Sequence, residues 1–425
     1  MQLKKQLTDS IVFFKTFRQW RHIAKKTTKH SFSASDKCLV IVPCDPWSVG
    51  GSRGDEAMIM GVIDYYLSLY HDMQIFIVCA NDKGVDYINS LPIQNINPIV
   101  SWNGSYPVER IYYSICDVYP SDVVVLGADC MDGYYSPVLS ESLLAIYDLC
   151  NKTVGINSYL LGFSLNNNPS WLMRMAFKSV SSDLPIRLRD PMSFQRYKKL
   201  IGNSANLVAD AAFLLRPNNK FRLYDEICEW VKKQRDGGKT IIGVNFHPML
   251  RKYTGKEEIK KDALIVAKNI ENILLAHKDV DLVFIPHDNR SMLTDNLMLT
   301  TMYAYLHDKG LTDRVFYSSF VPRSSQLKAI CGLLDGIISS RMHLAIAALG
   351  MGIPVMAATY QGKFEGLFMH FGLDPKYLLS PKEFLSDDML DVFNDFMSNL
   401  PDLQKQITKQ LPNVLKLSIL NLKNV

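Results

Sequence analysis

From Lys37 onward, the sequence alternates short β-branched or apolar runs with longer helical stretches. Parallel strands need long crossover connections, which are usually helices, so this alternation predicts parallel α/β units. We expect the strands of the first half to form one doubly wound sheet. They are CLVIVPC (38–44), MQIFIVC (73–79), DVVVLGA (122–128), KTVGINS (152–158), LPIRLRD (184–190) and NLVADA (206–211).

The alternation is interrupted once and then restarts. Residues 216–240 are polar and have chain-breaking residues at both ends, RPNNK at the start and RDGGKT at the end, with one short helix between them. Five further strands are predicted in TIIGVNF, VDLVFIP, RVFYSS, DGIISS and IPVMAAT. The chain of 425 residues is long enough for two domains with separate cores. We therefore predict a basic N-terminal segment over 1–36, a doubly wound α/β domain over 37–220, and a second over 238–425 with C-terminal helices.

The composition excludes several classes of protein. With 48% hydrophobic and 21% charged residues, it is typical of a soluble globular chain. No apolar run approaches the roughly 20 residues needed to cross a bilayer, and no secretory signal is recognisable, so we expect a cytoplasmic protein. The eight cysteines lack CxxC pairs and zinc-type spacing, which predicts reduced, structural thiols and no metal site.

The positive charge is concentrated at one end of the chain. Residues 1–30 carry a net charge of +7, so the remaining residues carry −2 of the total of +5. This distribution argues against a general nucleic-acid-binding surface. On a helical wheel, one arc holds Lys15, Arg18, Arg21 and His22. The opposite arc holds Val12, Phe13, Phe17, Trp20 and Ile23, although Ile11 and Phe14 interrupt the separation.

Two interpretations of this N-terminal segment remain open. A basic amphipathic helix with aromatic residues can lie on an anionic membrane surface, which would make the protein peripheral on the inner membrane face. The alternative is a helix docked on the protein's own body, or a poorly ordered basic arm.

Polar residues at the carboxyl ends of the predicted strands are the candidates for function, because ligands of parallel sheets bind there. In the loop DPWSVGGSRGDEAM, Gly51 and Gly54 allow close approach of the backbone to a ligand. Asp55 and Glu56 follow, and they either contact substrate or complement the helix dipole. After VVVLGA, Asp129 is placed to act as a general base toward a hydroxyl.

Arginine and histidine side chains occupy other strand ends. Arg187 and Arg189 alternate along one predicted strand and share a face, which is costly unless an anion or a carboxylate lies between them. Arg189 therefore binds a ligand or pairs with a carboxylate. In the second half, the corresponding positions hold Asn245, His247 and His287, and the loop TYQGKFEGLF adds Lys363 and Glu365.

The segment SSRMHLAIAALGMGIPV (339–355) has only two strongly polar side chains after its serines, Arg341 and His343. We expect Ser339 or Ser340 to cap the helix and Arg341 and His343 to lie in its first turn. There they could flank an anion at the helix N-terminus. A histidine with a near-neutral pKa beside an anion is suited to donate a proton.

Together these motifs resemble the polysaccharide pyruvyltransferase family. The resemblance rests on GDEA, GAD, RLRDPMS, VADAAFLL, IPHD, SSRMHLAIAALGMGIPV and TYQGKFEGLF, in that order along the chain. It leaves out the first 35 residues and about the last 40. Arg53 departs from the pattern, in which an asparagine or a small residue is expected.

The resemblance implies two Rossmann-like domains that face a cleft, as in GT-B type glycosyltransferases. It further implies transfer of an enolpyruvyl unit from phosphoenolpyruvate to two hydroxyls of a sugar, forming a pyruvate ketal in polysaccharide biosynthesis. The acceptor is a saccharide, free or lipid-linked, bound on the side of the first domain, and phosphoenolpyruvate is bound by the second. No metal or redox cofactor is required.

The implied chemistry assigns roles to individual residues. His343 would protonate C3 of the donor, Asp129 would deprotonate the acceptor, and Arg341 and Arg189 would bind the donor's anionic groups. The other substrate-binding candidates are Ser340, Gly51, Gly54, Asp55, Glu56, Asn245, His247, His287, Lys363 and Glu365.

Two other functions remain open. One is a nucleotide-sugar glycosyltransferase of the same architecture, although Asp279 and Asp281 resemble a turn before a strand more than a DxD motif. The other is a non-catalytic saccharide-binding protein.

Overall fold

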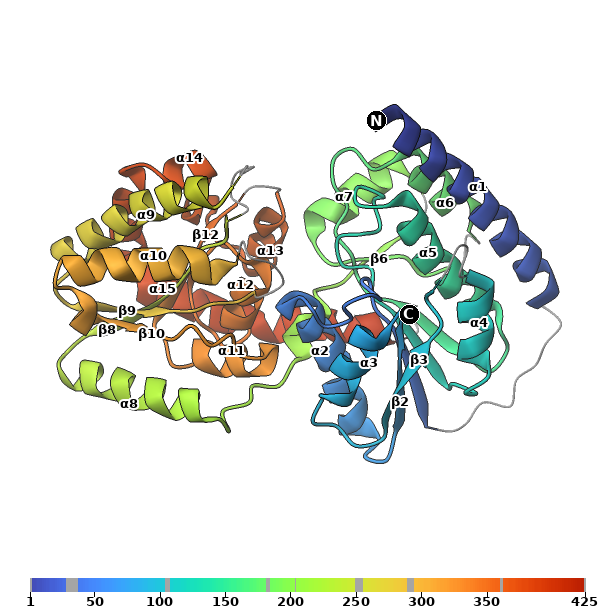
Figure 1. The fold of residues 1–425 in the computed structure, drawn as a ribbon, viewed down its shortest axis with the longest axis horizontal. Coiled ribbons are helices and arrows are strands. Elements are labelled where there is room, and N and C mark those ends of the chain that lie inside the picture. Colours follow the sequence, from blue (N-terminus) through green and yellow to red (C-terminus); the bar gives the residue numbers. More distant parts are fainter. Residues whose placement is uncertain are drawn as a thin grey trace. The chain divides into compact units, whose positions relative to one another are not determined.

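Figure 1 shows the fold of the chain in a computed structural model. The structure describes residues 2–27, 37–103, 108–180, 184–202, 204–248, 255–288, 294–359 and 362–423. The chain divides into two compact units. The first unit comprises Met1–Gly50, Met58–Leu215 and Leu415–Val425, and the second comprises Gly51–Ala57 and Arg216–Val414. The sequence did not predict that Gly51–Ala57 belongs to the second unit or that Leu415–Val425 belongs to the first.

A five-stranded parallel sheet forms the centre of the first unit, in the order β3-β2-β1-β4-β5. Its strands are β1 (Cys38–Val42), β2 (Gln74–Cys79), β3 (Ile96–Val100), β4 (Asp122–Val125) and β5 (Asn157–Leu160). The strand order reverses between β1 and β4, as in doubly wound folds, and ligands bind at such reversals. The sequence predicted β1, β2 and β4.

Several predictions for the first unit need correction. β3 was not expected because it contains Pro98, which an edge strand tolerates. The strand expected over 152–158 lies later, because the preceding helix continues to Lys152. The last two expected strands do not join the main sheet: β6 (Arg187–Leu188) and β7 (Asn206–Leu207) pair with each other, and Leu188 forms an isolated parallel bridge to Phe163. The side chains of Arg187 in β6 and of Arg189, directly after it, are buried and need polar partners that a central strand between helices would not offer.

Helices cover the sheet of the first unit. They are α2 (Arg53–Leu69), α3 (Asp82–Asn89), α4 (Val108–Cys116), α5 (Pro137–Lys152), α6 (Trp171–Ser179) and α7 (Pro191–Leu200), with short 3-10 turns at Ala211–Leu214 and Leu420–Leu422. The first turn of α2 belongs to the second unit and the rest of it to the first.

The N-terminal helix α1 (Gln2–Thr27) packs against α5 in the first unit. Phe13, Trp20 and Ile23 are buried, and the indole N–H of Trp20 donates to Asp148 at 2.8 Å. The inner face of this helix is therefore docked on the protein's own body.

A six-stranded parallel sheet forms the centre of the second unit, in the order β10-β9-β8-β11-β12-β13. Its strands are β8 (Thr240–Asn245), β9 (Val280–Phe284), β10 (Val315–Tyr317), β11 (Gly336–Ser339), β12 (Val355–Ala358) and β13 (Leu378–Leu379). The sequence predicted all of them except β13, which is too short to give a pattern. The stretch expected to be a polar connection contains the 15-residue helix α8 (Arg222–Asp236) and belongs to this unit.

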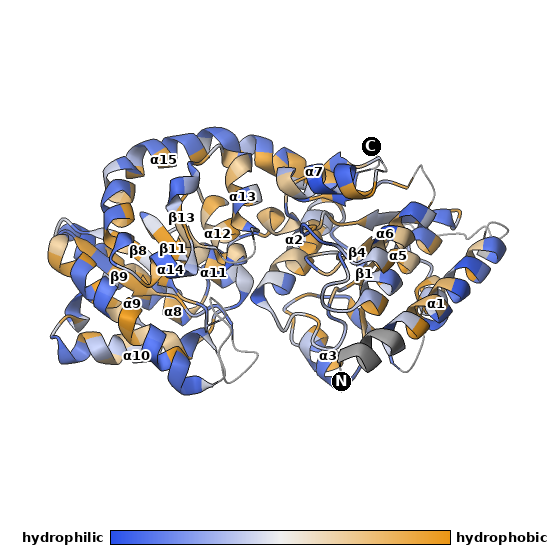
Figure 2. Ribbon diagram, turned by 90° about the horizontal axis from the view of Figure 1, so that it is seen from above, coloured by the Kyte–Doolittle hydropathy of each residue, from blue (hydrophilic) through white to orange (hydrophobic). Residues whose placement is uncertain are grey.

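The remaining helices of the second unit pack around its sheet. They are α9 (Lys256–Ala276), α10 (Asp295–Asp308), α11 (Ser324–Cys331), α12 (Met342–Leu349), α13 (Phe364–Phe371), α14 (Pro381–Phe384) and α15 (Asp388–Ile419), with 3-10 turns at Thr312–Arg314 and Pro375–Tyr377. Figure 2 shows hydrophobic residues on the strands and inner helix faces and hydrophilic residues on outer faces. Within the described part of the chain, no helix has both the length and the apolar character needed to cross a membrane.

Candidate functional site

Polar side chains gather at the carboxyl edge of the second sheet, where β9, β8, β11 and β12 are neighbours. Asn245 is the last residue of β8, and His287 and Asp288 follow β9. Arg341 follows β11 directly before α12. Parallel strands end at the same edge, so residues more than 90 positions apart in the chain meet here.

Asp295, at the start of α10, connects three of these segments. Its buried carboxylate accepts hydrogen bonds from Arg341 Nη2 at 2.6 Å, from Asn245 Nδ2 at 2.9 Å and from the backbone N–H of His287 at 3.1 Å. Asp295 was not expected from the sequence, because an aspartate in the first turn of a helix is usually explained by the helix dipole. Asp295 holds the guanidinium of Arg341 in a fixed orientation.

Arg341 also forms an ion pair with Asp288 at 3.0 Å. The described contacts occupy three of its five N–H groups, so the guanidinium retains donors for an anion. Arg341 is the N-cap residue of α12 and adopts an extended conformation, which corrects the expectation that it lies in the first turn. Its side chain is 12% exposed.

The two serines before Arg341 do not cap α12 as expected. Ser340 Oγ instead accepts a hydrogen bond from the backbone N–H of His247 at 2.5 Å, and Ser339 Oγ accepts from the N–H of Arg341 at 3.0 Å. Ser340 therefore ties the loop after β11 to the loop after β8, whereas Ser339 holds the backbone of Arg341 within its own loop. The rest of α12, Leu344 to Leu349, is buried, as its apolar sequence predicts.

His343 lies in the first turn of α12, against the first turn of α2. A Cβ atom on Gly54 would lie 2.3 Å from His343 Nδ1 and 2.8 Å from Cε1, which is too close for any side chain. Gly54 was expected to let the backbone approach a ligand. In the structure, its missing side chain makes room for the imidazole of His343. Gly51 lies in the same short segment of the second unit.

The carboxylate of Glu56 is engaged within the second unit. It accepts hydrogen bonds from the backbone N–H of Ser324 at 2.7 Å and from its hydroxyl at 3.1 Å, at the start of α11. It also pairs with Arg53 at 2.7 Å, and Arg53 in turn donates to the carbonyl of Val321. Glu56 therefore anchors two helix starts to each other, whereas Asp55 is half-buried.

Two buried polar atoms in this cluster have no hydrogen-bond partner among the described residues, His287 Nδ1 and Asn245 Oδ1. Burial, and then the nearby charge of Arg341, lower the pKa of His287 far below its ordinary value, although Asp288 opposes the shift. His287 is therefore a neutral imidazole. An unsatisfied buried polar atom costs about 1–3 kcal/mol, so this pair is characteristic of a site that a ligand completes.

Lys363 and Glu365 lie after β12, next to β11 in the sheet. Lys363 is the N-cap residue of α13, and Glu365 accepts a hydrogen bond from the hydroxyl of Thr359 at 3.4 Å. Both side chains are half-buried. The loop after β12 thus adds a cation and a carboxylate to the same edge of the sheet.

In the first unit, Asp129 follows β4 at the reversal of strand order. The hydroxyl of Tyr135 donates to its carboxylate at 3.3 Å, and both Tyr134 and Tyr135 are exposed. Ala128, directly before Asp129, has φ of 46°, in the left-handed region that non-glycine residues rarely adopt. Such backbone strain is common at functional sites, because the surrounding structure must hold it.

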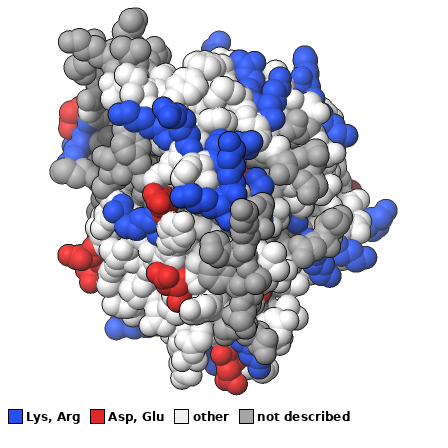
Figure 3. Space-filling view, turned by 90° about the vertical axis from the view of Figure 1, so that its right-hand side faces the viewer, with Lys and Arg blue, Asp and Glu red and all other residues white. Residues whose placement is uncertain are grey.

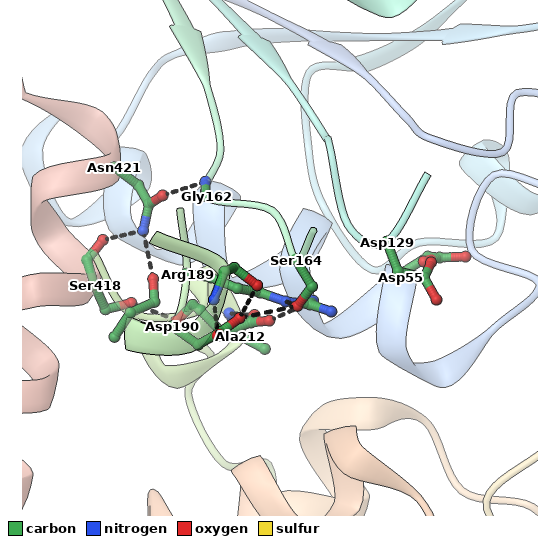
Figure 4. A network of polar contacts seen from close by, with 12 residues as sticks. Asp55, Asp129, Gly162, Ser164, Arg189, Asp190, Ala212, Ser418 and Asn421 are labelled. Carbon is green, nitrogen blue, oxygen red and sulfur yellow. Dashed lines mark hydrogen bonds and ion pairs between the residues drawn. The ribbon is translucent and has the colours of Figure 1, made fainter. Parts of the chain in front are cut away.

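Arg189 lies in a closed network, shown in Figure 4. It pairs with Asp210 at 2.8 Å and donates to Ser164 Oγ at 2.8 Å, and Ser164 donates to Asp190 at 3.1 Å. The residue is only 4% exposed. The sequence left two alternatives for Arg189, binding a ligand or pairing with a carboxylate. In the structure, Arg189 pairs with the carboxylate of Asp210. The neighbouring Arg187 donates to backbone carbonyls of the C-terminal segment.

No group of three or more His, Cys, Asp or Glu side chains suited to a metal ion occurs in the part of the chain that the structure describes. All eight cysteines are free thiols.

The comparison with protein families decides the classification. The model of the family described as polysaccharide pyruvyl transferase matches residues 53–362. The chain belongs to this family. The matched region of this pyruvyl transferase family member contains the cluster around Asp295, together with His343, Gly54, Asp129 and Arg189. Gly51, Lys363 and Glu365 lie just outside it. A search of curated proteins gives no match.

Solved structures show which fold this family member shares. A putative UDP-N-acetylglucosamine 2-epimerase from Listeria monocytogenes aligns with a TM-score of 0.52 at 12% identity, covering 88% of this chain and 91% of the other. A UDP-GlcNAc 2-epimerase from Neisseria meningitidis gives 0.52 at 11% identity, covering 91% and 99%. A ugt transferase from Siraitia grosvenorii gives 0.51 at 11% identity, covering 91% and 98%. The family member therefore has two Rossmann-like domains of the GT-B type.

Proposed function

We propose that this protein transfers an enolpyruvyl unit from phosphoenolpyruvate to two hydroxyls of a saccharide, forming a pyruvate ketal. The observation that carries the proposal is the edge of the second sheet, where His343 and the oriented guanidinium of Arg341 lie beside unsatisfied buried atoms. Family membership supports transferase chemistry with a saccharide. What we propose beyond family membership is that phosphoenolpyruvate is the donor and that a ketal is the product.

The proposed donor step uses residues of the second unit. The π electrons of the C2–C3 double bond of phosphoenolpyruvate take a proton from His343, which leaves C2 electrophilic. Arg341 donates its remaining N–H groups to an anionic group of the donor, in the orientation that Asp295 fixes. Because Asp288 and Asp295 already outweigh the charge of Arg341, we infer that Lys363 contributes further positive charge.

Ketal formation then balances as follows. The first hydroxyl oxygen bonds to C2 and loses its proton to a base, for which we propose Asp129. The second hydroxyl oxygen bonds to C2 as the bond from C2 to the phosphate oxygen breaks. Phosphate leaves with the electron pair of that bond and takes up the proton of the second hydroxyl, and the proton held by Asp129 replaces the one that His343 gave to C3. One phosphoenolpyruvate and one diol thus give one ketal and one phosphate, with no oxidation or reduction.

The surroundings of Asp129 support a saccharide as the acceptor. Tyr134 and Tyr135 present exposed aromatic rings beside the carboxylate, and the Tyr135 hydroxyl already contacts it. Aromatic rings bind the apolar face of a sugar, while a carboxylate accepts hydrogen bonds from its hydroxyls. Asp129 could therefore hold the acceptor by its hydroxyls, with the two tyrosine rings against the sugar, and then remove a proton from one of these hydroxyls.

The proposal is tested by incubating the purified protein with phosphoenolpyruvate and a panel of saccharide acceptors. We expect phosphate release together with a mass increase of one acceptor that corresponds to a ketal. A parallel set of reactions contains nucleotide sugars instead of phosphoenolpyruvate. Nucleotide release with one acceptor, without phosphate release from phosphoenolpyruvate with any of them, would show a glycosyltransferase and overturn the proposal.

Replacing His343 tests the proposed acid. His343→Ala and His343→Asn should lower kcat by about 10²–10⁴-fold, the range for loss of a general acid. The melting temperature should stay close to that of the wild type, because neither replacement adds volume beside Gly54. His307→Ala, at an exposed histidine of α10, is the matched control and should keep full activity. Full activity in either His343 variant would remove this residue from the mechanism.

A further inference from the structure

The outer face of α1 carries a stripe of exposed side chains that the docking on α5 leaves uncovered. Its members are Ile11, Phe14, Arg18, Arg21 and Lys25, all of them exposed. Their spacing of three and four residues places them on one side of the helix. The stripe belongs to the first unit and lies away from the buried face formed by Phe13, Trp20 and Ile23.

One end of the stripe is apolar. Ile11 is 50% exposed and Phe14 is 42% exposed, and the ring of Phe14 lies 6.2 Å from that of Trp171 at the start of α6. Trp171 is itself 57% exposed. Three large apolar side chains from two helices thus face outward together, although the same helix buries other aromatic residues efficiently.

The other end of the stripe is basic. Arg18, Arg21 and Lys25 are followed by Lys178 at the end of α6, and Arg21 donates to the carbonyl of Ser179 at 2.9 Å, which joins the two helices. Among the residues that the structure describes, few acidic groups surround this end of the stripe. Asp9 is half-buried, and Glu109 of α4 accepts a hydrogen bond from Gln19, on the other side of the helix. Figure 3 shows Lys and Arg side chains gathered across the upper half of this side of the molecule.

We propose that this stripe binds the surface of an anionic lipid bilayer. Aromatic and aliphatic side chains enter the boundary between headgroups and acyl chains, and Lys and Arg beside them interact with lipid phosphates. A nucleic acid would use the cations but would leave Ile11, Phe14 and Trp171 without a role. Because the opposite face of α1 is fixed to α5, binding would hold the whole first unit at the membrane. This inference does not depend on the proposed reaction.

The test is co-sedimentation of the full chain with vesicles. One set of vesicles contains phosphatidylcholine alone, and the other contains equal parts of phosphatidylcholine and phosphatidylglycerol. We expect binding to the anionic vesicles at low salt and a loss of binding at high salt, where the charges are screened. Absence of binding to anionic vesicles at low salt would overturn the proposal. Binding to DNA but not to vesicles would do the same and would indicate a nucleic-acid surface.

Two variants separate the contributions of charge and of apolar contact. Arg18→Glu/Lys25→Glu/Lys178→Glu reverses three exposed charges, and it should weaken vesicle binding by about tenfold or more. Phe14→Ala/Trp171→Ala should weaken it while leaving its salt dependence in place. The matched control reverses three exposed lysines of the second unit, Lys232, Lys233 and Lys261, with the same change in net charge. An equal loss in the control variant would show that net charge, and not this surface, causes binding.

Discussion

Arg189 and Arg341 offer a direct comparison between the two units. Both arginines follow a short strand, both were expected to bind the donor's anionic groups, and both form ion pairs with aspartate. Arg189 has its charge balanced in a network of serine and aspartate side chains that is closed to solvent. Arg341 keeps partial exposure and unused N–H groups, and Asn245 and His287 beside it have unsatisfied buried atoms.

The comparison shows that an arginine at a strand end does not by itself indicate a ligand. What distinguishes the two positions is whether the surrounding polar groups satisfy one another. In the first unit, Arg189, Asp210 and Ser164 do so and stabilise the fold. In the second unit, the cluster around Asp295 is incomplete, so it is the better candidate for binding an anion.

The largest expected effect concerns the closed network. Arg189→Ala leaves the charge of Asp210 buried without its partner, so the free energy of unfolding should fall by about 3–5 kcal/mol. Denaturant unfolding followed by circular dichroism measures this change. The matched control is Arg222→Ala, which removes an ion pair with Glu226 on the surface and should cost less than about 1 kcal/mol. If both variants lost the same stability, Arg189 would not have the structural role assigned to it.

A smaller effect, on activity, is expected at Gly54. Gly54→Ala places a methyl group where the imidazole of His343 lies, so the ring must move. A displacement of this kind should lower kcat/KM by about 10- to 100-fold. Phosphate release from phosphoenolpyruvate measures it. Gly255→Ala, at a position with no atom within 4 Å of the added carbon, should keep wild-type activity. Wild-type activity in Gly54→Ala would separate His343 from the reaction.

The effect that is smallest for each step of the measurement is a difference in the pH dependence of the two units. Burial raises the pKa of Glu141 in α5 to about 9, so this residue stays protonated in the folded first unit. The unfolded chain releases that proton above its ordinary pKa, so the stability of the first unit should fall as the pH rises from 4.5 toward 9. His287, whose pKa is lowered, stays neutral when folded and binds a proton when unfolded. The second unit should therefore lose stability as the pH falls below 6.5.

Hydrogen exchange of amides in β1 and in β8 measures these two slopes separately, and each should be at most about 1.4 kcal/mol per pH unit for one group. Glu141→Gln should flatten the first dependence and leave the second unchanged. His287→Asn should do the reverse. Slopes that respond equally to both variants would contradict the assignment of one titrating group to each unit.

Much of the fold could be predicted from residue patterns. Strands such as β1 and β8 are continuous apolar runs buried on both sides, and their pattern is visible without a structure. The predictions failed where local pattern and environment disagree. The edge strand β3 was not predicted because it contains Pro98. A strand of the main sheet was predicted around Arg187 and Arg189 because the two arginines alternate with apolar residues, but only the two-residue strand β6 forms there.

The candidate site could be predicted only in part. Arg341, His343, His287 and Asn245 were found because they follow apolar strands in sequence. Asp295 was missed because its role depends on three partners that are up to 50 residues away in the chain. Glu56 and Ser340 were expected to contact substrate, and their oxygen atoms hydrogen-bond instead to helix and loop backbones.

The sequence by itself determined the alternation of strands and helices, the family and the chemical character of the residues at the strand ends. These properties depend on periodicity and local spacing, which the chain carries in its order of residues. Only the tertiary structure decided which charges neutralise one another, that Gly54 makes room for His343, and that α1 buries one face and exposes the other. Such outcomes depend on distances between side chains that are remote in the chain, because burial and hydrogen bonding are properties of the folded surroundings of each group.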